Sequence, residues 1–252
     1  MAQHWLEITS DYDPEEWSHV LGPAGSPGRD LTVVDDSGVP ALRWGNTGTG
    51  RIQYHWDVVD VAEDFEIFCL SRTDDAGSSS ANAPGLGGRM SSSLINGYIA
   101  SYRVAGRLFS TRWQNDSQTV LNTSSIGNGV SNPEAYHWMG VAAGGSAIKY
   151  FSWDGAITDR PVTPRYSTTD TTLTGAGPVG LMATAVTQPG YARIVTVGTD
   201  GDPAPTGPVD VSAEAFTLRH NPRTNKVIPV LSSPTVTDIG AACVRPRVTK
   251  GY

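Results

Sequence analysis

Cysteine is scarce in this sequence, and long apolar runs are missing. The two cysteines, Cys69 and Cys243, lie far apart, and each sits in an apolar, strand-like segment. Because secreted disulfide scaffolds use more and denser cysteines, we expect two buried free thiols. No apolar run approaches the roughly twenty residues that cross a bilayer, and the amino-terminal stretch lacks the basic start and apolar core of a signal peptide. The sequence therefore predicts a protein made in the cytoplasm, without membrane insertion.

Positive charge is also in short supply. There are 18 Lys and Arg residues against 25 Asp and Glu residues, and the formal net charge is −7. Phosphate binding needs an excess of basic residues, so we expect no nucleic-acid partner. The sequence also lacks a nucleophile elbow, a phosphate loop, a dinucleotide fingerprint and histidine spacings typical of zinc or iron sites. These absences disfavour the enzyme classes that depend on such motifs.

Glycine, proline and short alternating segments are what the sequence has instead. Its 252 residues include 28 Gly and 17 Pro. Apolar and polar residues alternate with a period of two, which is typical of β-strands, and helical periodicity is nearly absent. A chain of this length can bury a substantial core in one domain. We therefore predict an all-β sandwich or barrel with almost no helix.

Several segments are predicted to form pairs of strands joined by a turn. These segments are 31–44, 97–113, 138–153 and 177–200, with turns marked by Asp-Ser-Gly, Ala-Gly, Ala-Gly-Gly-Ser and Thr-Gln-Pro-Gly. The segment 63–73 is largely apolar on both faces and is predicted to lie centrally in a sheet. The stretch 74–90 is rich in Gly, Ser and Ala, which predicts a long surface loop.

The character of the sequence changes near residue 203. Prolines become frequent beyond this point, and they favour extended segments. About fifty residues are marginal for an independent core. We therefore expect residues 1–203 to form the sandwich and residues 204–252 to form an extended arm that docks on another protein.

Two stretches resemble a known fold family. The string "YHWMGVAAGGSAIKYFSWDG", from Tyr136 to Gly155, and the later "GPVGLMATAV" and "YARIVTVGTDG" resemble the concanavalin A-like, or laminin G-like, β-sandwich. In that family, Trp followed by a Val-rich strand, a Gly turn, an Ile-Lys-aromatic strand and a Trp-Asp-Gly end form one hairpin. The resemblance covers about residues 1–200. It implies a concanavalin A-like antiparallel β-sandwich, or jelly roll.

The carboxyl-terminal stretch carries a second resemblance. The string "VLSSPTVTDIGAACVRPRVT" is similar to segments of tailed-bacteriophage structural proteins, notably minor tail proteins. This resemblance implies a virion protein that assembles in the host cytoplasm, in agreement with the missing signal peptide. An extended arm can complete the sheet edge of a neighbouring subunit. We expect other virion proteins and further copies of this chain as partners.

Aromatic residues are the candidates for binding sugar, since sugar rings stack on exposed Trp and Tyr. Alternation divides the aromatic residues of 136–155 between opposite faces, so they do not converge on one site. Trp153 and Asp154, at the end of that hairpin, remain candidates if they are exposed. Trp113, Tyr166 and Tyr191 are candidates for a glycan-facing rim.

Calcium is the one candidate cofactor, because laminin G-like domains often carry this ion at the rim between their sheets. A hard cation needs several converging oxygens, and Asp200 and Asp202 offer two carboxylates. The aspartate pairs at 74–75 and 35–36 are further candidates. Aspartates also cap ordinary turns, so each pair has a purely structural interpretation as well.

Glycoside hydrolysis is the catalytic alternative, since some members of the resembled superfamily are glucanases. Those enzymes carry Glu-x-Asp-x-x-Glu on one strand, where alternation points the carboxylates to one face. The nearest run here offers Glu63, Asp64 and Glu66 at a different spacing, and only Asp64 and Glu66 share a face. We therefore expect no catalysis.

The leading hypothesis from the sequence is a non-enzymatic bacteriophage virion structural protein. As a minor tail protein it would act in tail assembly and in attachment to glycans on the host surface. Two alternatives stay open: a polysaccharide-degrading enzyme that depends on Glu66, and a free carbohydrate-binding lectin.

Overall fold

A computed structural model describes the chain at residues 2–21, 31–44, 51–73, 85–91, 94–103, 107–122, 132, 134–184, 189–209, 216–221 and 226–231. The chain divides into two compact units, Met1–Val209 and Asp210–Tyr252. The division falls a few residues after the boundary predicted near 203. Docking by the carboxyl-terminal segment stays a prediction.

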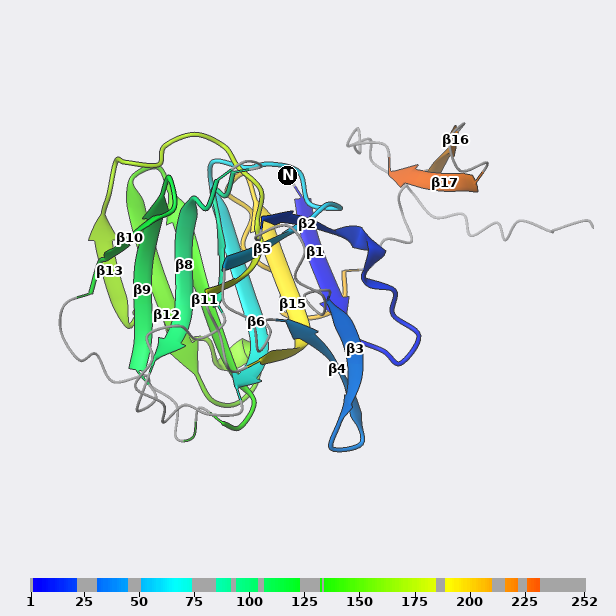
Figure 1. Cartoon of the computed structure of the whole chain (residues 1–252), viewed down its shortest axis with the longest axis horizontal. Helices are drawn as coiled ribbons and strands as arrows, with labels where there is room; N and C mark the ends of the chain where they lie inside the picture. The colour runs from blue at the N-terminus through cyan, green and yellow to red at the C-terminus, as the bar shows by residue number, and fades with distance from the viewer. Residues whose placement is uncertain are drawn as a thin grey trace, which may run out of the picture. The chain divides into compact units, whose positions relative to one another are not determined.

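Two antiparallel sheets form the first unit, and in Figure 1 both run across the view and overlap. The eight-stranded sheet has the order β13 (Tyr166–Thr169), β12 (Ala147–Trp153), β11 (His137–Gly144), β6 (Phe65–Thr73), β15 (Gly190–Thr199), β4 (Val39–Trp44) and β3 (Thr32–Asp36), with β1 (Ala2–Glu7) also paired to β15. The seven-stranded sheet has the order β10 (Ser117–Val120), β9 (Arg107–Gln114), β8 (Gly97–Arg103), β7 (Gly85–Gly88), β14 (Gly180–Thr184), β5 (Arg51–Trp56) and β2 (Trp17–Leu21).

The second unit contains one hairpin in its described part, in which β16 (Phe216–Asn221) pairs with β17 (Lys226–Leu231). Helix is limited, among the described residues, to two 3-10 turns, Pro14–Glu16 and Ile157–Asp159. None of the helices in the described part is long and apolar enough to span a membrane. The all-β prediction is confirmed.

The main core lies between the two sheets. Inward-facing residues of β6, such as Ile67 and Cys69, meet residues of the opposite sheet such as Tyr54, Leu86 and Tyr98 in one buried cluster. Residues on the inner faces of two packed sheets alternate with outward-facing ones, as the period of two requires. Cys69 is a free thiol, as predicted, and burial raises its pKa to about 12. Cys243 lies outside the described residues.

The outer face of the eight-stranded sheet carries a second apolar cluster. Phe68, Trp138, Phe151 and Trp153 pack there together, and Ala204 lies against them. Strand β6 is therefore buried on both faces and lies centrally in its sheet, which confirms the prediction for 63–73.

Two strand predictions are wrong. Gly85–Gly88 belongs to the stretch predicted as a loop, but it forms the buried strand β7; residues 74–84 lie outside the described part. A Cβ atom at Gly87 would lie 1.9 Å from the carbonyl oxygen of Tyr98, so only glycine allows this close approach, and glycine makes the strand look like a loop. The predicted pair within 177–200 is also not a hairpin. Its two halves, β14 and β15, lie in different sheets and pair with other strands.

Candidate functional site

A row of four side chains crosses the outer face of the eight-stranded sheet. Tyr191 of β15 lies directly opposite Arg43 of β4 on one side and Arg72 of β6 on the other. Tyr136 stands just before β11 and continues the row beside Arg72, because β11 pairs in register with β6. Tyrosine rings and guanidinium groups therefore alternate across four neighbouring strands. With Asp36 and Arg193, described next, these residues form a set of six that we call the ladder.

A β-bulge places Arg193 on this outer face. The pairing of β15 with β6 shifts between Ala192 and Ile194. Ala192 and Val195 both lie in the main core, whereas Ile194 packs against the outer cluster. Arg193 and Ile194 therefore both point away from the core, which strict alternation along a strand would not allow.

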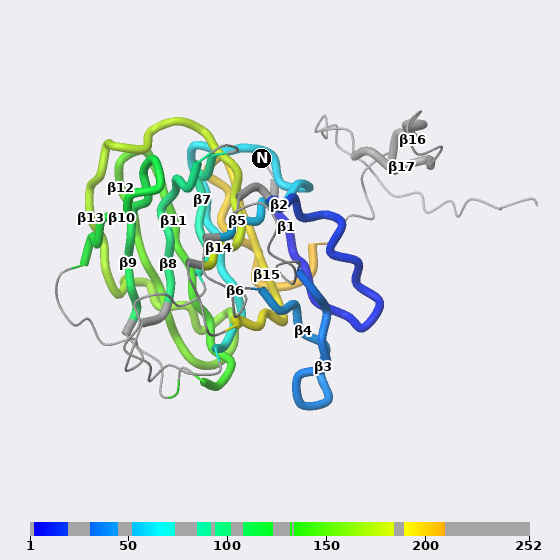
Figure 2. The backbone as a smooth tube through the Cα atoms, in the orientation of Figure 1, coloured from blue at the N-terminus to red at the C-terminus, as the bar shows by residue number. Residues whose placement is uncertain are grey.

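Strands β3 and β4 form a tight hairpin at one edge of the sandwich (Figure 2). Asp36, at the end of β3, contacts Arg72 of the ladder. The turn of this hairpin consists of Ser37 and Gly38, with φ values of 60° and 84°, and two positive φ values are what a type I′ turn requires. Asp35 accepts a hydrogen bond from the Gly38 N–H at 2.5 Å, whereas the Asp36 side chain accepts a hydrogen bond from Arg72. Neighbouring strand residues point to opposite faces, so Asp35 and Asp36 do not form a calcium pair.

The Asp36 carboxylate is the central acceptor of the ladder. It accepts hydrogen bonds from Arg72 Nε at 2.8 Å, from Arg72 Nη2 at 2.5 Å and from the Tyr136 hydroxyl at 2.5 Å. Arg193 Nη2 donates to the backbone oxygen of Asp36 at 3.2 Å. The hydrogen bonds from Arg72 outweigh partial burial and lower the pKa of Asp36 to about 2. Burial, and then the neighbouring Asp36, raise the pKa of the Tyr136 hydroxyl.

Cation–π contacts join the arginines to the tyrosines. The guanidinium carbon of Arg193 lies 3.8 Å from the centroid of the Tyr136 ring, and that of Arg72 lies 4.3 Å from the Tyr191 centroid. The Arg72 and Arg193 side chains keep 18% and 27% of their accessible surface. The ladder is therefore an ordered surface of aromatic rings and hydrogen-bond donors that solvent still reaches.

Two of the predicted sugar-binding tryptophans are buried. Trp153 is 4% exposed, stacks on Trp138 and donates its indole N–H to the Ala156 oxygen at 2.9 Å. Trp113 is 3% exposed and packs in a small cluster with residues of the seven-stranded sheet. Neither ring is accessible for stacking on a sugar. Asp154 is exposed, but the tryptophan that precedes it faces the outer cluster.

Tyr166 and Tyr191 are both half-buried, but the structure does not bring them together. Tyr166 lies on the edge strand β13, and its hydroxyl donates to the Leu121 oxygen at 2.6 Å. Three strands, β12, β11 and β6, lie between it and β15, where Tyr191 joins the ladder. Of the five predicted sugar-binding residues, Tyr191 is the one that the structure places in the ladder.

Asp200 and Asp202 lie in the turn that follows β15. The N–H of Asp202 donates to the Thr199 oxygen at 3.1 Å, and the N–H of Asp200 donates to the Asp64 oxygen at 2.9 Å. Within the part of the chain that the structure describes, no three His, Cys, Asp or Glu side chains gather to hold a metal ion. Calcium binding at Asp200 and Asp202 stays a prediction, and residues 74–75 lie outside the described part.

The carboxylates of the catalytic alternative are held by structural partners. Glu66 accepts two hydrogen bonds from Arg160, at 2.6 and 2.7 Å, and a third from the Ala204 N–H at 3.0 Å. Asp64 accepts from the Gly145 N–H at 2.7 Å. Glu66 thus fastens two loop segments to the outer face of β6, which is a structural role.

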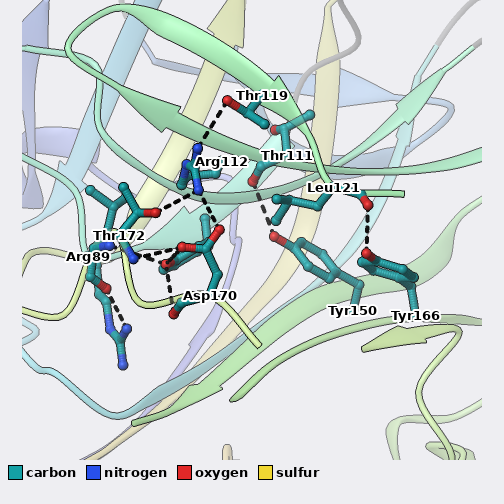
Figure 3. Close-up of polar contacts among 11 residues, drawn as sticks. Arg89, Thr111, Arg112, Thr119, Leu121, Tyr150, Tyr166, Asp170 and Thr172 are labelled. Atoms are coloured by element: carbon teal, nitrogen blue, oxygen red, sulfur yellow. Dashed lines mark hydrogen bonds and ion pairs between the residues drawn. The ribbon is translucent and has the colours of Figure 1, made fainter. Parts of the chain in front are cut away.

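A second polar network ties the two sheets together near Asp170 (Figure 3). The Asp170 carboxylate accepts from Arg112 Nη1 at 2.6 Å and from the Tyr98 hydroxyl at 3.0 Å. Figure 3 also shows the Tyr150 hydroxyl of one sheet directed at the Thr111 oxygen of the other, at 3.1 Å. Asp170, Tyr98 and Tyr150 are buried, so this network is a tie inside the sandwich.

Most ladder residues carry no obvious signal in the sequence. Tyr191 alone is predicted to bind sugar, and Asp36 is predicted only as a calcium candidate. The available signal is an arginine inside each of three apolar strands, at positions 43, 72 and 193. These arginines are far apart in sequence, and only the sheet order brings them together.

Solved structures resemble this fold, whereas no protein-family model and no curated protein sequence matches the chain. "Cellulose induced protein, Cip1" aligns with a TM-score of 0.53 and 13% identity over 78% of this chain and 97% of that one. A structure titled "native glycosidic hydrolase" gives 0.52 and 12% over 80% and 97%. The exoplasmic/lumenal domain of VIP36, bound to Ca2+ and Man3GlcNAc, gives 0.50 and 12% over 90% and 97%.

These likenesses establish the class of fold. The sandwich is concanavalin A-like, of the kind found in lectins and glycosidases, and the fold prediction is confirmed. At 12–13% identity the likeness shows the fold alone. The matched proteins include a hydrolase and a glycan-bound domain, and none of these three is described as a bacteriophage protein.

Proposed function

We propose that this protein binds carbohydrate without cleaving it, and that the sugar lies against the ladder. The observation that carries the proposal is the half-exposed array of tyrosine rings and guanidinium groups on the outer face of the eight-stranded sheet. The concanavalin A-like fold supports it, since one matched domain was solved with a bound oligosaccharide.

A sugar ring presents apolar C–H faces and a rim of hydroxyl groups. Tyrosine supplies a large rigid apolar surface at small conformational cost, and planar guanidinium groups donate paired hydrogen bonds. In the ladder, Tyr191 and Tyr136 offer the apolar surface. The hydrogen-bond donors come from Arg43, Arg72 and Arg193. The contacts to Asp36 hold two of these arginines in place before a ligand arrives, which lowers the entropic cost of binding.

The ladder lacks the chemistry of a retaining or inverting glycosidase. Such enzymes need two carboxyl groups, about 5 to 9.5 Å apart, of which one carries a proton at working pH. The ladder contains one carboxylate, and its pKa of about 2 keeps it ionised near neutrality. Glu66, the residue of the catalytic alternative, is bound by Arg160.

Replacing Tyr191 tests the proposed site. Wild type should bind at least one polysaccharide in a panel of plant, algal and bacterial glycans, and Tyr191→Ala should weaken that binding about tenfold, because a ring contact contributes on the order of 1 to 2 kcal/mol. Tyr166→Ala is the matched control, since it removes a half-buried tyrosine on the far edge of the same sheet. Affinity electrophoresis and calorimetry on folded variants measure the effect. Equal binding by wild type and Tyr191→Ala would place the site elsewhere.

The same preparations test catalysis. Wild type and Glu66→Gln should release no reducing sugar from any polysaccharide in the panel. Release by wild type that Glu66→Gln abolishes would replace the binding proposal with the enzyme alternative.

A place in a bacteriophage tail, with other virion proteins and further copies of this chain as partners, has no support from the matched structures. It stays a prediction from the carboxyl-terminal sequence. Glycan binding would serve host attachment in that setting. Mass spectrometry of purified virions tests it directly, and absence of the protein from the particles would exclude the virion role.

A further inference from the structure

We propose that the ladder selects glycans that carry carboxylate groups, such as polymers of uronic acids. The inference rests on the proposed function, since it names the class of sugar that the same surface takes. It is carried by the charge of the ladder and by two arginines that the protein leaves short of partners.

The ladder is positive in a protein whose net charge is −7. It holds three guanidinium groups, from Arg43, Arg72 and Arg193, against the single carboxylate of Asp36. Glu7 and Glu134 are exposed near its border, and neither forms an ion pair with a described ladder arginine. The six ladder residues alone carry two net positive charges, so an anionic ligand is favoured over a neutral one where it contacts the ladder arginines directly.

Asp36 satisfies Arg72, holds Arg193 mainly through its backbone oxygen, and forms no ion pair with Arg43. Arg72 gives Asp36 a two-pronged hydrogen bond, whereas the Arg193 Nη2 atom lies 4.0 Å from the carboxylate. Arg43 makes no ion pair with any residue that the structure describes. Within that described part, the Nε atoms of Arg43 and Arg193 are buried and find no hydrogen-bond acceptor. These Nε atoms are shielded from solvent, so a ligand would meet the terminal nitrogens of the two guanidinium groups. Arg43 makes no hydrogen bond or ion pair with a described residue, so its terminal nitrogens are the donors most in need of an acceptor.

The two underused arginines can converge on one ligand group. Arg43 lies opposite Tyr191, which stands two residues before Arg193 on β15, so the two arginines are diagonal neighbours. Diagonal neighbours in a sheet lie about 7 to 8 Å apart, which long side chains span easily. A guanidinium fork matches the two oxygens of a carboxylate, and such charge-assisted pairs are among the stronger hydrogen bonds in proteins. Asp36 holds Arg72 directly and lies 4.0 Å from Arg193 Nη2, and it forms no ion pair with Arg43. The carboxylate of the sugar therefore belongs at Arg43, with Arg193 as the second donor.

Matched polymers that differ only in charge test the inference. The probes are oligogalacturonate, oligoalginate and oligoglucuronate, each beside its fully methyl-esterified form, with binding measured by calorimetry at 20 to 300 mM NaCl, about the range over which screening changes strongly. Wild type should bind the acid form of at least one pair about tenfold or more tightly than the ester. This preference should shrink as salt rises, because screening weakens the ionic contact.

Charge-removing variants then locate the effect. Arg43→Gln and Arg193→Gln should each lower affinity for the acid form about tenfold and leave affinity for the ester nearly unchanged, and Arg193→Lys should restore part of the loss. Arg165→Ala is the matched control, since it removes an exposed arginine on a loop outside the ladder and should change neither affinity.

The outcomes separate the two proposals. Equal affinity for acid and ester in every pair, or a preference that survives Arg43→Gln and Arg193→Gln, overturns the carboxylate inference. If a neutral glycan still binds and Tyr191→Ala weakens it, the proposed function stands without the inference. Failure to bind any glycan, acidic or neutral, overturns both.

Discussion

The molecule contains two trios of the same residue types in two different surroundings. In the ladder, Asp36 accepts from Arg72 and Tyr136; inside the sandwich, Asp170 accepts from Arg112 and Tyr98. Both arrangements lower the pKa of the aspartate. At Asp36 the largest cause is hydrogen bonding from Arg72, whereas at Asp170 burial opposes the shift and several hydrogen bonds, first among them from Thr172, outweigh it.

What surrounds each trio decides what it can do. The Asp170 trio joins a buried tyrosine of one strand to a loop across the sandwich, and its single arginine is matched by a single carboxylate (Figure 3). The Asp170 trio joins the two sheets, and the Nε atom of its arginine also lacks an acceptor within the described residues. The Asp36 trio differs in lying beside two further arginines and a tyrosine, Arg43, Arg193 and Tyr191, on an outer face. Identical chemistry therefore serves structure in one place and, we propose, recognition in the other.

The largest difference between the trios should appear in stability. Asp170→Ala should destabilise the protein by about 3 to 5 kcal/mol, because it leaves the Tyr98 hydroxyl and Arg112 without their buried partner. Asp36→Ala should cost less, about 2 to 3 kcal/mol. The two aspartates and their arginines are equally exposed, but the Tyr136 hydroxyl that loses its acceptor is half-buried, whereas Tyr98 is fully buried. Urea unfolding followed by fluorescence measures both changes. A larger loss for Asp36→Ala than for Asp170→Ala would contradict the division into tie and surface site.

Acid should weaken the ladder trio in a defined pH window. The pKa of Asp36 is about 2 in the folded protein and 3.8 ordinarily, so the unfolded chain takes up the proton first as pH falls. The stability that Asp36 contributes is complete above about pH 4 and is lost as pH falls toward 2, by roughly 2 kcal/mol in all. Asp36→Asn should therefore lose less stability than wild type over this window in unfolding titrations. Parallel losses in both proteins would show that Asp36 is not the titrating group.

Removing one hydroxyl from each trio gives the smallest contrast. Tyr98→Phe should cost about 2 kcal/mol, since its hydroxyl donates to Asp170 and accepts from the Leu173 N–H in the core. Tyr136→Phe should cost about 1 kcal/mol or less, because its hydroxyl is only half-buried and Arg72 still holds Asp36. Thermal melts of both variants check the order, and equal shifts would remove the distinction.

Much of the fold follows from local pattern, and the candidate site does not. The hairpins at 31–44, 97–113 and 138–153, and the central place of β6, are confirmed because alternation and turn residues act within a few positions of one another. The ladder joins positions 36, 43, 72, 136, 191 and 193, and no short-range pattern links them. Of these, sequence reasoning connects only Tyr191 with sugar.

By itself the sequence determined the all-β class, the alternation of each strand and the Ser37–Gly38 turn, since each depends on the backbone preferences of neighbouring residues. Tertiary structure decided that Trp113 and Trp153 are buried, and that β14 and β15 lie in different sheets. It also decided the position of Arg193. The bulge between Ala192 and Ile194 lets both Arg193 and Ile194 point outward between the core-facing Ala192 and Val195, which unbroken alternation does not allow. Sheet order and bulges arise from contacts between distant strands, and for that reason a reading of local pattern finds the strands and misses the ladder.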